Sequence, residues 1–290
     1  MAQNGISELA TKELRQKAKL DLAAAKRATD GNVRATYDIT QLPTQYDDNG
    51  IIDNENAGGL IVGRPWIAAP AFANPTLTIG SAVTTSAVSP FAGGGNSYNF
   101  ISSVNSYIQA PASADWAMGT GDFTVEWFSN QTTLTQFQRI FTVGDYPAID
   151  FGVSIESGTF YYWSGGDTDF EYSSASAATT NTWYHWAVVR QSGTVSVYRD
   201  GVLRGSSFAN SDNINDSLTA FVVGNTNTYA TNAALVGALT NFRLVKGLAV
   251  YTGNFTVPTS ALTATTSANP YGGSNTAAIS AGFTKLLLVP

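Results

Sequence analysis

Hydrophobic and polar residues alternate with a period of two along most of the chain from Tyr98 onward. Such alternation predicts β-strands. The segments that show it are 107–110, 123–129, 138–143, 151–156, 159–163, 183–191, 194–199, 220–223 and 238–245. Turn-forming pairs separate them, among them Ser192-Gly193 and Asp200-Gly201, where glycine suits the positive φ of a hairpin turn. Many short strands with turns at regular spacing predict an antiparallel β-sandwich.

The segment 183–191 predicts a strand that is covered on both faces. Because strand side chains alternate, one face carries Trp183, His185, Ala187 and Val189, and the other carries Tyr184, Trp186 and Val188. Both sets are bulky. His185 is the only histidine, and the sequence places no partner for catalysis or metal binding near it. We therefore interpret His185 as a packing residue whose ring nitrogens are both hydrogen-bonded.

A helix is predicted ahead of the strands, from about Ser7 to Thr29. Ser7 suits the N-cap position, and Asp30-Gly31 supplies a stop signal. A narrow apolar stripe recurs at spacings of three or four, formed by Ile6, Ala10, Leu14, Ala18, Leu22, Ala25 and Ala28. A helix of roughly 23 residues is marginal in water unless such a stripe packs on something.

Two interpretations of this helix remain open. The stripe either lies across its own domain or docks on another subunit through Ile6, Leu14, Ala18 and Leu22. Contact with nucleic acid is disfavoured, because acidic residues interrupt the basic ones and no aromatic residues interleave.

The residues between the helix and the strands look extended and irregular. Residues 58–70 form an apolar arm, in which Pro65 favours an edge or wrapping segment and Trp66 is a further candidate for subunit docking. Residues 74–97 have the composition of a linker. We therefore divide the chain into a helical anchor at 1–34, an arm and linker at 35–97, and a β-sandwich with a C-terminal tail at 98–290.

Amino-acid composition supports an all-β fold for residues 98–290 and excludes several classes of function. Only 12% of the residues are charged, against 43% hydrophobic, so Ser, Thr, Asn and Gly supply most of the polarity. The absence of cysteine excludes disulfides and thiolate metal sites. No run of 18 apolar residues exists to span a membrane, and the N-terminus lacks the apolar core of a signal peptide. We expect any release from a cell to occur by lysis or within an assembled particle.

Charge is divided unevenly along the chain. Residues 1–34 carry seven basic and four acidic groups, whereas the remaining residues carry eight basic and seventeen acidic groups. This asymmetry predicts that the N-terminal segment and the body meet different partners.

Three motifs in sequence order resemble the laminin-G-like domains of the concanavalin A-like superfamily. Gly119-Thr-Gly-Asp-Phe-Thr-Val-Glu-Trp, after Tyr107-Ile-Gln, resembles the opening strands. Trp183-Tyr-His-Trp-Ala-Val-Val-Arg with Val195-Ser-Val-Tyr-Arg-Asp-Gly is similar to the central hairpin. The run from Val236-Gly-Ala-Leu-Thr-Asn-Phe-Arg to Pro258 is similar to the closing strand and tail of versions common in phages and environmental bacteria. The resemblance spans about 105–263 and implies a mainly β, jelly-roll sandwich.

Some relatives of this fold are glucanases, whose hydrolytic site is E-x-D-x-E on one strand. The nearest match is Asp167-Thr168-Asp169-Phe170-Glu171, whose first carboxylate is one methylene shorter. It follows Gly165-Gly166, which indicates a loop or a strand edge, and its Ser and Ala neighbours supply no aromatic cleft. No motif for a serine or cysteine nucleophile is present. We therefore predict no catalytic residues and no enzymatic activity.

Sugar binding fits the sequence better, because sugars are held by aromatic faces and by Asn and Asp side chains on loops. The candidate carbohydrate-binding residues are Asp145, Tyr146, Asp167, Asp169, Asn225, Asn227 and Tyr229. Each could instead belong to a solvated turn.

No cofactor is expected, with calcium as the one candidate ion. The four carboxylates of residues 46–56 offer oxygen ligands but lack the EF-hand spacing, which favours a solvated turn. Thr240-Asn241 stand where many relatives carry acidic residues, which also argues against calcium. The sequence does not determine a metal site.

These features favour a non-enzymatic structural protein of a phage virion, of the decoration, fibre or neck-associated kind. Its partners would be other virion proteins, docked through the helix and arm, and cell-surface glycans bound by the sandwich. Neither nucleic acid nor a membrane is expected as a partner. A homo-oligomer, or many copies in one assembly, is predicted. The alternatives are a free carbohydrate-binding module and, third, a divergent β-glucanase.

Overall fold

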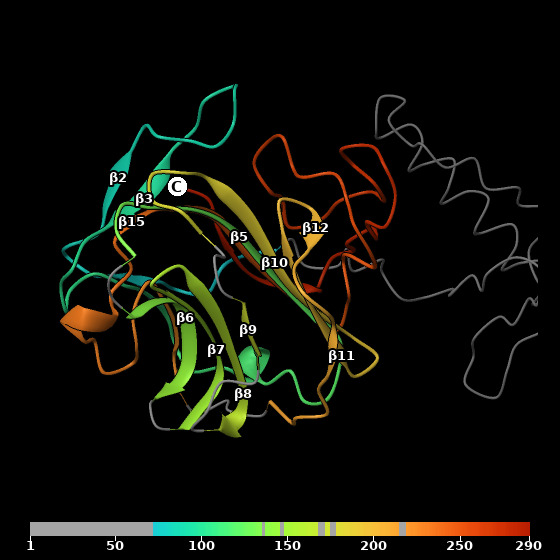
Figure 1. Cartoon of the computed structure of the whole chain (residues 1–290), viewed down its shortest axis with the longest axis horizontal. Coiled ribbons are helices and arrows are strands. Elements are labelled where there is room, and N and C mark those ends of the chain that lie inside the picture. The colour runs from blue at the N-terminus through green and yellow to red at the C-terminus, as the bar shows by residue number, and fades with distance from the viewer. Residues whose placement is uncertain (1–71, 135–136, 146–147, 168–171, 175–177, 215–218) are drawn as a thin grey trace, which may run out of the picture. The chain divides into compact units, whose positions relative to one another are not determined.

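The computed structural model describes residues 72–134, 137–145, 148–167, 172–174, 178–214 and 219–290. Within these residues the chain forms two antiparallel sheets packed as a sandwich (Figure 1). The helix predicted at 7–29, the acidic turn at 46–56 and the apolar arm around Trp66 lie outside the described residues. No helix in the described part of the chain is long and apolar enough to cross a membrane.

The smaller sheet has seven strands. In spatial order they are β1 (Thr78–Ile79), β4 (Ile108–Ala110), β14 (Phe221–Val223), β6 (Phe137–Asp145), β7 (Ala148–Glu156), β8 (Thr159–Asp167) and β9 (Tyr172–Ser174). The long strands β6, β7 and β8 form a continuous antiparallel meander. Two single-turn 3₁₀ helices, Ala114–Trp116 and Thr231–Ala233, are the helical elements among the described residues.

The larger sheet has nine strands. Along its main path lie β12 (Val202–Leu203), β11 (Thr194–Arg199), β10 (Tyr184–Gln191), β5 (Phe123–Gln131), β15 (Gly237–Lys246), β3 (Ser97–Phe100) and β2 (Thr84–Ser86). Two further strands lie off this path: β13 (Phe208–Ala209) pairs with β11, and β16 (Thr284–Leu288) pairs with β15. The centre of the sheet is β5, which pairs with β10 on one side and β15 on the other.

All nine strands predicted from the alternation are present, with ends shifted by three residues or fewer, apart from β8, which extends four residues further. The segment 74–97 differs from the predicted linker, because it contains β1, β2 and the first residue of β3. The predicted C-terminal tail likewise contains β16. β1 and β2, with two and three residues, are too short to show a period, so they depend on their neighbours in the sheet.

The space between the sheets is filled by aromatic side chains. Trp127 of β5 stacks on Trp186 of β10 and on Phe242 of β15, with ring centroids 6.4 and 6.3 Å apart. From the smaller sheet, Phe141 stacks on Phe221 at 5.2 Å. These rings are almost completely buried, so they supply much of the apolar area that stabilises the fold.

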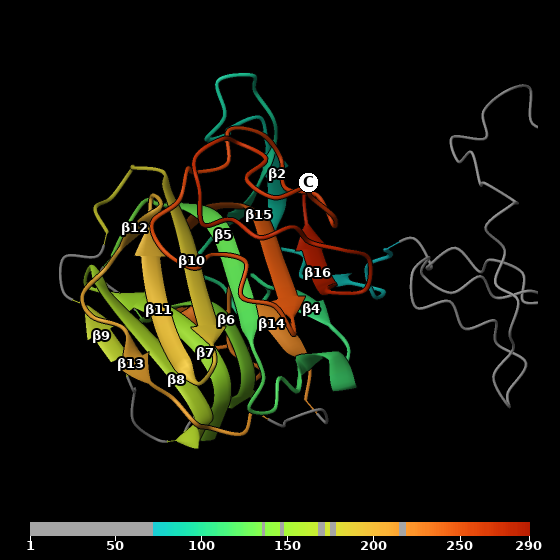
Figure 2. The same ribbon diagram turned by 90° about the vertical axis from the view of Figure 1, so that its right-hand side faces the viewer.

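The outer face of the larger sheet is buried as well. Residues 247–283 run across it (Figure 2) and close over a second apolar cluster. Ala187 and Val189 of β10 belong to this cluster, whereas Trp186 and Val188 belong to the main core. The prediction of a strand covered on both faces is therefore confirmed.

The hairpin turns predicted at Ser192-Gly193 and Asp200-Gly201 are also present. Each pair has positive φ at both positions, 48° and 75° in the first turn and 52° and 75° in the second, as a type I′ turn requires. The second turn is fixed from outside, because the Phe255 N–H donates to the Gly201 carbonyl at 2.9 Å. A Cβ atom at Gly201 would lie 2.1 Å from the Phe255 carbonyl oxygen, so only glycine fits there.

Candidate functional site

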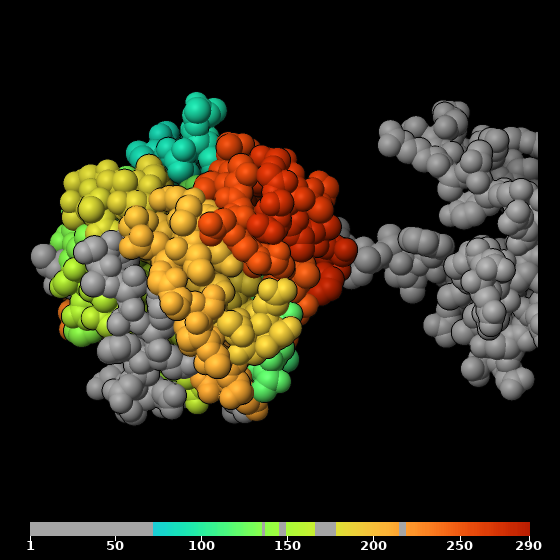
Figure 3. Space-filling view, turned by 45° about the vertical axis from the view of Figure 1, so that its right-hand side comes forward, coloured from blue at the N-terminus to red at the C-terminus, as the bar shows by residue number. Residues whose placement is uncertain are grey.

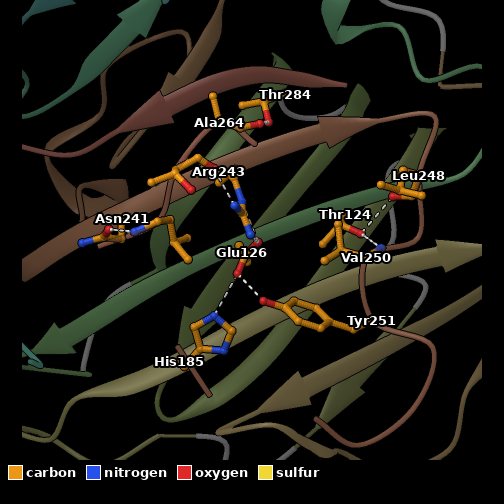
Figure 4. Close-up of polar contacts among 12 residues, drawn as sticks. Thr124, Glu126, His185, Asn241, Arg243, Leu248, Val250, Tyr251, Ala264 and Thr284 are labelled. Carbon is orange, nitrogen blue, oxygen red and sulfur yellow. Dashed lines mark hydrogen bonds and ion pairs between the residues drawn. The ribbon is translucent and has the colours of Figure 1, made fainter. Parts of the chain in front are cut away.

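Four polar side chains meet beneath the cover on the outer face of the larger sheet. Glu126 comes from β5, His185 from β10, Arg243 from β15 and Tyr251 from the covering segment (Figure 4). Strand register brings the first three together, because Glu126 lies directly opposite Arg243 on one side and Ala187 on the other, and His185 is two residues before Ala187. We call these four residues the Glu126 cluster.

The Glu126 carboxylate is saturated with hydrogen bonds. Arg243 Nε and Nη2 donate to Oε1 at 2.9 and 2.6 Å. Tyr251 Oη donates to Oε2 at 2.7 Å, and His185 Nε2 lies 3.1 Å from the same oxygen. An ionised carboxylate only accepts hydrogen bonds, so His185 Nε2 carries the proton of this contact.

Burial and charge act in opposite directions on these groups. Burial alone would raise the pKa of Glu126, but the Arg243 charge and the hydrogen bonds from His185 and Tyr251 outweigh it and lower the pKa from 4.5 to about 2. Burial and the Glu126 charge hold the pKa of Tyr251 well above 10.0. The cluster therefore contains an ionised Glu126 and a neutral Tyr251 at neutral pH.

The residue types of the Glu126 cluster are those of many catalytic sites, but its geometry is that of a structural site. Glu126 is fully buried and already accepts four hydrogen bonds, so no lone pair remains to receive a proton from a substrate. The cluster connects three strands to the covering segment that follows β15. Tyr251 belongs to this segment, and Arg243 Nη1 donates to the Thr263 carbonyl of the same segment at 2.6 Å.

His185 contradicts part of the sequence interpretation. Glu126 is a partner that the sequence analysis missed, and only one of the two ring nitrogens is hydrogen-bonded, since Nδ1 has no partner among the described residues. The physical reason is the aromatic surroundings of the ring, which packs on Phe128 at 4.6 Å and on Phe255 at 5.6 Å between centroids.

A surface pocket of about 380 Å³ opens beside His185. Its apolar wall consists of Pro90, Phe91, Ala92, Phe128, Trp183, Val257 and Pro258. The lining also includes the polar residues Asp200 and Thr259, and the fully buried His185 lies at its base. The pocket therefore draws on four parts of the chain: the loop between β2 and β3, the strands β5 and β10, the Asp200-Gly201 turn, and the covering segment. Figure 3 shows the loop before β3 (teal), the β10–β12 region (yellow to orange) and the covering segment (red) meeting on one face. We call this surface pocket the Trp183 pocket.

Asp200 of the Trp183 pocket is held by the backbone of β10. Asp200 Oδ1 accepts a hydrogen bond from the His185 backbone N–H at 2.9 Å, and the Asp200 N–H donates to the His185 carbonyl at 2.8 Å. The Asp200 side chain stays 48% exposed, and its Oδ2 lies 3.9 Å from Arg199 Nε. His185, at the base, is fixed by Glu126. The pocket thus has a rigid polar side and an aromatic side.

Part of the predicted binding set lies at one end of the smaller sheet. Asp145 ends β6 and Asp167 ends β8, and both pair with the first residues of β7. Asn227 Nδ2 donates to the Gly144 carbonyl at 3.1 Å, which places its loop at the same end. Tyr146 and Asp169 lie outside the described residues.

Asn225 and Tyr229 hold loops together. Asn225 is completely buried, and its Nδ2 donates to the Ser103 and Ser106 carbonyls at 3.3 Å. Tyr229 stacks on Tyr107 with ring centroids 4.3 Å apart. Asn225 is therefore out of reach of a sugar in this structure.

The predicted docking residues Ile6, Leu14, Ala18, Leu22 and Trp66 lie outside the described residues. Within the described ranges, no group of three or more His, Asp or Glu side chains has an arrangement that could hold a metal ion. The candidate site is thus the Trp183 pocket, which the sequence analysis missed as a unit. Glu126 and Arg243, charged residues in the middle of strands β5 and β15, were the signal that the outer face carries more than packing.

Comparison with known proteins gives one family and a set of similar folds. Residues 102–248 match the laminin-G-like family model described as "Concanavalin A-like lectin/glucanases superfamily". No curated protein matches the sequence.

Several solved structures are similar to the chain. One is the binding domain of Paraclostridial Mosquitocidal Protein 1, with 13% identity and a TM-score of 0.47 over 60% of this chain and 44% of that one. Another is domain 4 of the extracellular arabinanase AbnA of Geobacillus stearothermophilus in complex with arabinotriose, with 19% identity and a TM-score of 0.46 over 60% and 82%. A putative carbohydrate binding protein of Bacteroides ovatus has 17% identity and a TM-score of 0.37 over 45% and 38%. The chain thus spans less than half of the first of these structures.

Proposed function

The chain belongs to the concanavalin A-like lectin/glucanases superfamily, and on this premise we propose that it is a non-enzymatic, glycan-binding protein. The observation that carries the proposal is the Trp183 pocket. It combines aromatic walls, against which the apolar face of a sugar ring stacks, with the half-exposed carboxylate of Asp200, which accepts hydrogen bonds from hydroxyl groups.

Two features of the outer face support binding over hydrolysis. A glycosidase needs two carboxyl groups on either side of the scissile bond, whereas Asp200 is the one carboxylate that the described residues contribute to the pocket lining. Glu126, beneath the pocket, is fully buried and saturated by its partners. A bound glycan would therefore be held without being cleaved.

We further propose that the sandwich is displayed on a phage virion, with residues 1–34 and the arm around Trp66 docking on other virion proteins. The opposite charge balance of residues 1–34 and of the remaining chain supports separate partners for the two parts. Mass spectrometry of purified particles should then detect the protein, and deleting residues 1–34 should abolish its incorporation. Absence of the protein from particles would leave the free carbohydrate-binding module as the better proposal.

Glycan binding is tested with an array probed by the purified full chain, with and without calcium. We expect a defined subset of glycans to bind, and the Trp183→Ala variant to lose that signal because the stacking surface is removed. A matched control is Phe137→Ala, since Phe137 is 46% exposed and does not line the pocket. If every glycan fails under both conditions, the proposed function is wrong.

A further inference from the structure

The outer face of the smaller sheet carries a buried cation that plays no part in the proposed glycan binding. Arg139 of β6 lies directly opposite Ser154 of β7, and Ser154 lies opposite Tyr161 of β8. Their sequence neighbours Ile155 and Tyr162 belong to the main core, so Arg139, Ser154 and Tyr161 face outward. The Trp183 pocket lies on the outer face of the other sheet, so the two features belong to different layers of the sandwich (Figure 1).

Arg139 is almost completely buried, yet its donors are not paired. The residue is only 6% exposed, and its Nε and Nη1 have no hydrogen-bond partner among the described residues. Ser154 Oγ, across the strand pair, is likewise buried without a partner there. A buried donor that makes no hydrogen bond lowers stability, and a buried charge without a counter-charge lowers it further. Arg139 therefore lowers the stability of the free protein.

Two kinds of neighbour offset this penalty only in part. The guanidinium carbon of Arg139 lies 4.4 Å from the centre of the Trp163 ring and 5.9 Å from that of Phe137. Such cation–π contacts attract the charge without accepting its hydrogen bonds. Burial lowers the pKa of Arg139 from 12.5 to about 10, and the charge of Glu156 opposes this shift. In the described part of the chain no carboxylate lies within 4 Å of the guanidinium, so Arg139 is charged at neutral pH without a direct ion pair.

The groups around Arg139 indicate which acceptor it would bind. A carboxylate is planar, accepts two parallel hydrogen bonds from one edge of a guanidinium and supplies one negative charge for one cation. A phosphate dianion would bring a second charge close to Glu156, which would repel it. A water molecule would accept a hydrogen bond but leave the charge of Arg139 uncompensated. Arg139 therefore fits a carboxylate best.

The surroundings of Arg139 favour a protein over an acidic sugar as the source of this carboxylate. A sugar ring stacks on a free aromatic face, but Trp163 is only 6% exposed and the guanidinium already lies over its ring. Phe137, by contrast, is 46% exposed and offers apolar contact to a side chain beside the carboxylate. An arginine flanked by aromatic side chains is typical of the centre of protein–protein interfaces.

We propose that the outer face of the smaller sheet docks an acidic segment of a partner protein, whose Asp or Glu carboxylate binds Arg139. The carboxylate accepts two hydrogen bonds from the guanidinium, and an apolar side chain next to it packs on Phe137. This contact neutralises the buried charge that the fold leaves unpaired. It is separate from glycan binding, which belongs to the Trp183 pocket.

The test is an array of short peptides probed with the purified full chain, in which every acidic peptide has a counterpart with Gln for Glu and Asn for Asp. We expect binding to peptides in which an acidic residue neighbours an apolar one, and binding to their amide counterparts that is weaker by roughly tenfold or more. Arg139→Met should abolish this difference. Arg139→Lys keeps the charge but not the planar pair of donors, so it should also weaken binding. Trp183→Ala is the matched control and should bind the peptides like the wild type.

Two further measurements separate a binding role from a structural one. Glu156→Gln removes a carboxylate that competes for Arg139, so it should strengthen the binding of acidic peptides severalfold. Arg139→Met removes a buried charge and two unpaired donors, so the midpoint of its thermal unfolding without peptide should equal or exceed that of the wild type. A lower midpoint would mean that Arg139 stabilises the fold, which would overturn the inference.

Three binding results would also overturn it. One is equal binding of acidic peptides and their amide counterparts, and another is peptide binding that persists unchanged in Arg139→Met. The third is an array on which no peptide binds while glucuronate-bearing glycans bind and are lost in Arg139→Met, because the carboxylate would then come from a sugar. The Glu156→Gln variant keeps the test decisive if Arg139→Met fails to fold, since unchanged or weaker peptide binding in it would contradict the docking of a carboxylate at Arg139.

Discussion

The two faces of the larger sheet are both buried, but by different means. The inner face packs aromatic and aliphatic side chains such as Trp127, Trp186 and Leu244 against the smaller sheet. The outer face, one residue out of phase on the same strands, carries Glu126 and Arg243 under a cover of loops. The burial of the inner face therefore depends on side-chain volume, whereas that of the outer face also depends on the direction of hydrogen bonds.

This difference indicates where function can reside. Apolar packing tolerates changes that conserve volume, because it has no preferred direction. Hydrogen bonds to a buried carboxylate fix angles as well as distances. Glu126 thus fixes the His185 ring at the base of the pocket, and the His185 backbone N–H holds Asp200 at its rim. A hydrogen-bonded polar layer beneath a binding pocket fixes the orientation of the side chains above it, which a further apolar layer would not do.

The largest effect on stability is expected from breaking the polar layer. Glu126→Gln leaves the Arg243 guanidinium buried with no counter-charge, which should lower the free energy of unfolding by about 4 kcal/mol. Denaturant unfolding at pH 7 measures it. The double variant Glu126→Leu, Arg243→Met replaces the pair with apolar groups and should recover most of the loss. A double variant as unstable as the single one would mean that the ion pair itself, not the uncompensated charge, is essential.

The next-largest effect on stability concerns the inner face. Its dependence on pH should distinguish the inner face from the outer one. Leu244→Ala should lower the free energy of unfolding by about 3 kcal/mol, through lost burial and a residual cavity. This loss should be the same at pH 7 and pH 3, because no ionisable group is involved. Denaturant unfolding at both pH values provides the comparison.

Glu126 should behave differently in acid. Its folded pKa of about 2 lies below the ordinary 4.5, so its ionised form stabilises the fold fully above about pH 4.5. That contribution is lost as the pH falls toward 2. The cost of Glu126→Gln should therefore shrink over this range, whereas that of Leu244→Ala should not. A cost of Glu126→Gln that is unchanged at pH 2 would contradict the depressed pKa.

The smallest of the three effects concerns the contact between the sheet and its cover. Thr124 Oγ1 donates to the Leu248 carbonyl at 3.1 Å and accepts the Val250 N–H at 2.8 Å. Thr124→Val keeps the shape but removes both bonds, which should lower the free energy of unfolding by about 2 kcal/mol. Thr124→Ser keeps the hydroxyl and should cost less. Faster hydrogen exchange of the Val250 amide in the valine variant would locate the change in the cover.

The two faces also explain what the sequence could and could not predict. Alternation located the inner face well, because Val125, Trp127, Trp186 and Val188 recur every second residue and apolar contacts need only the right side of the strand. The turns at Ser192 and Asp200 were predictable from the demand for positive φ. The edge strands β1 and β2 were not, since they are too short for a period.

The candidate site needed information that alternation does not contain. Glu126 and Arg243 are 117 residues apart in the chain, and only the pairing register of β5 with β15 places them opposite each other. Phe91, Trp183, Asp200 and Thr259 come from segments that neither share a strand nor follow a spacing rule. Alternation therefore identifies His185 as a packing residue, and residue type alone places the sugar-binding candidates elsewhere, around Asp145 and Asp167 and in the uncharged segment 225–229.

The position of β16 has a consequence for the order in which the protein is made. Residues 284–288 pair with Phe242 to Val245 and place Leu286 and Leu288 in the main core. The ribosome must therefore extend the chain about 40 residues past β15 before Phe242 to Val245, which lie beyond the pairing of β15 with β3, gain a neighbour on that side. This is a delay of a few seconds at about 5 to 20 residues per second. During this interval the central strands are already synthesised but lack part of their core and the whole of their cover. Completion of the larger sheet thus comes after synthesis of its central strands, and a nascent chain stalled before residue 284 would expose the unpaired edge of β15 at Phe242 to Val245 to its neighbours.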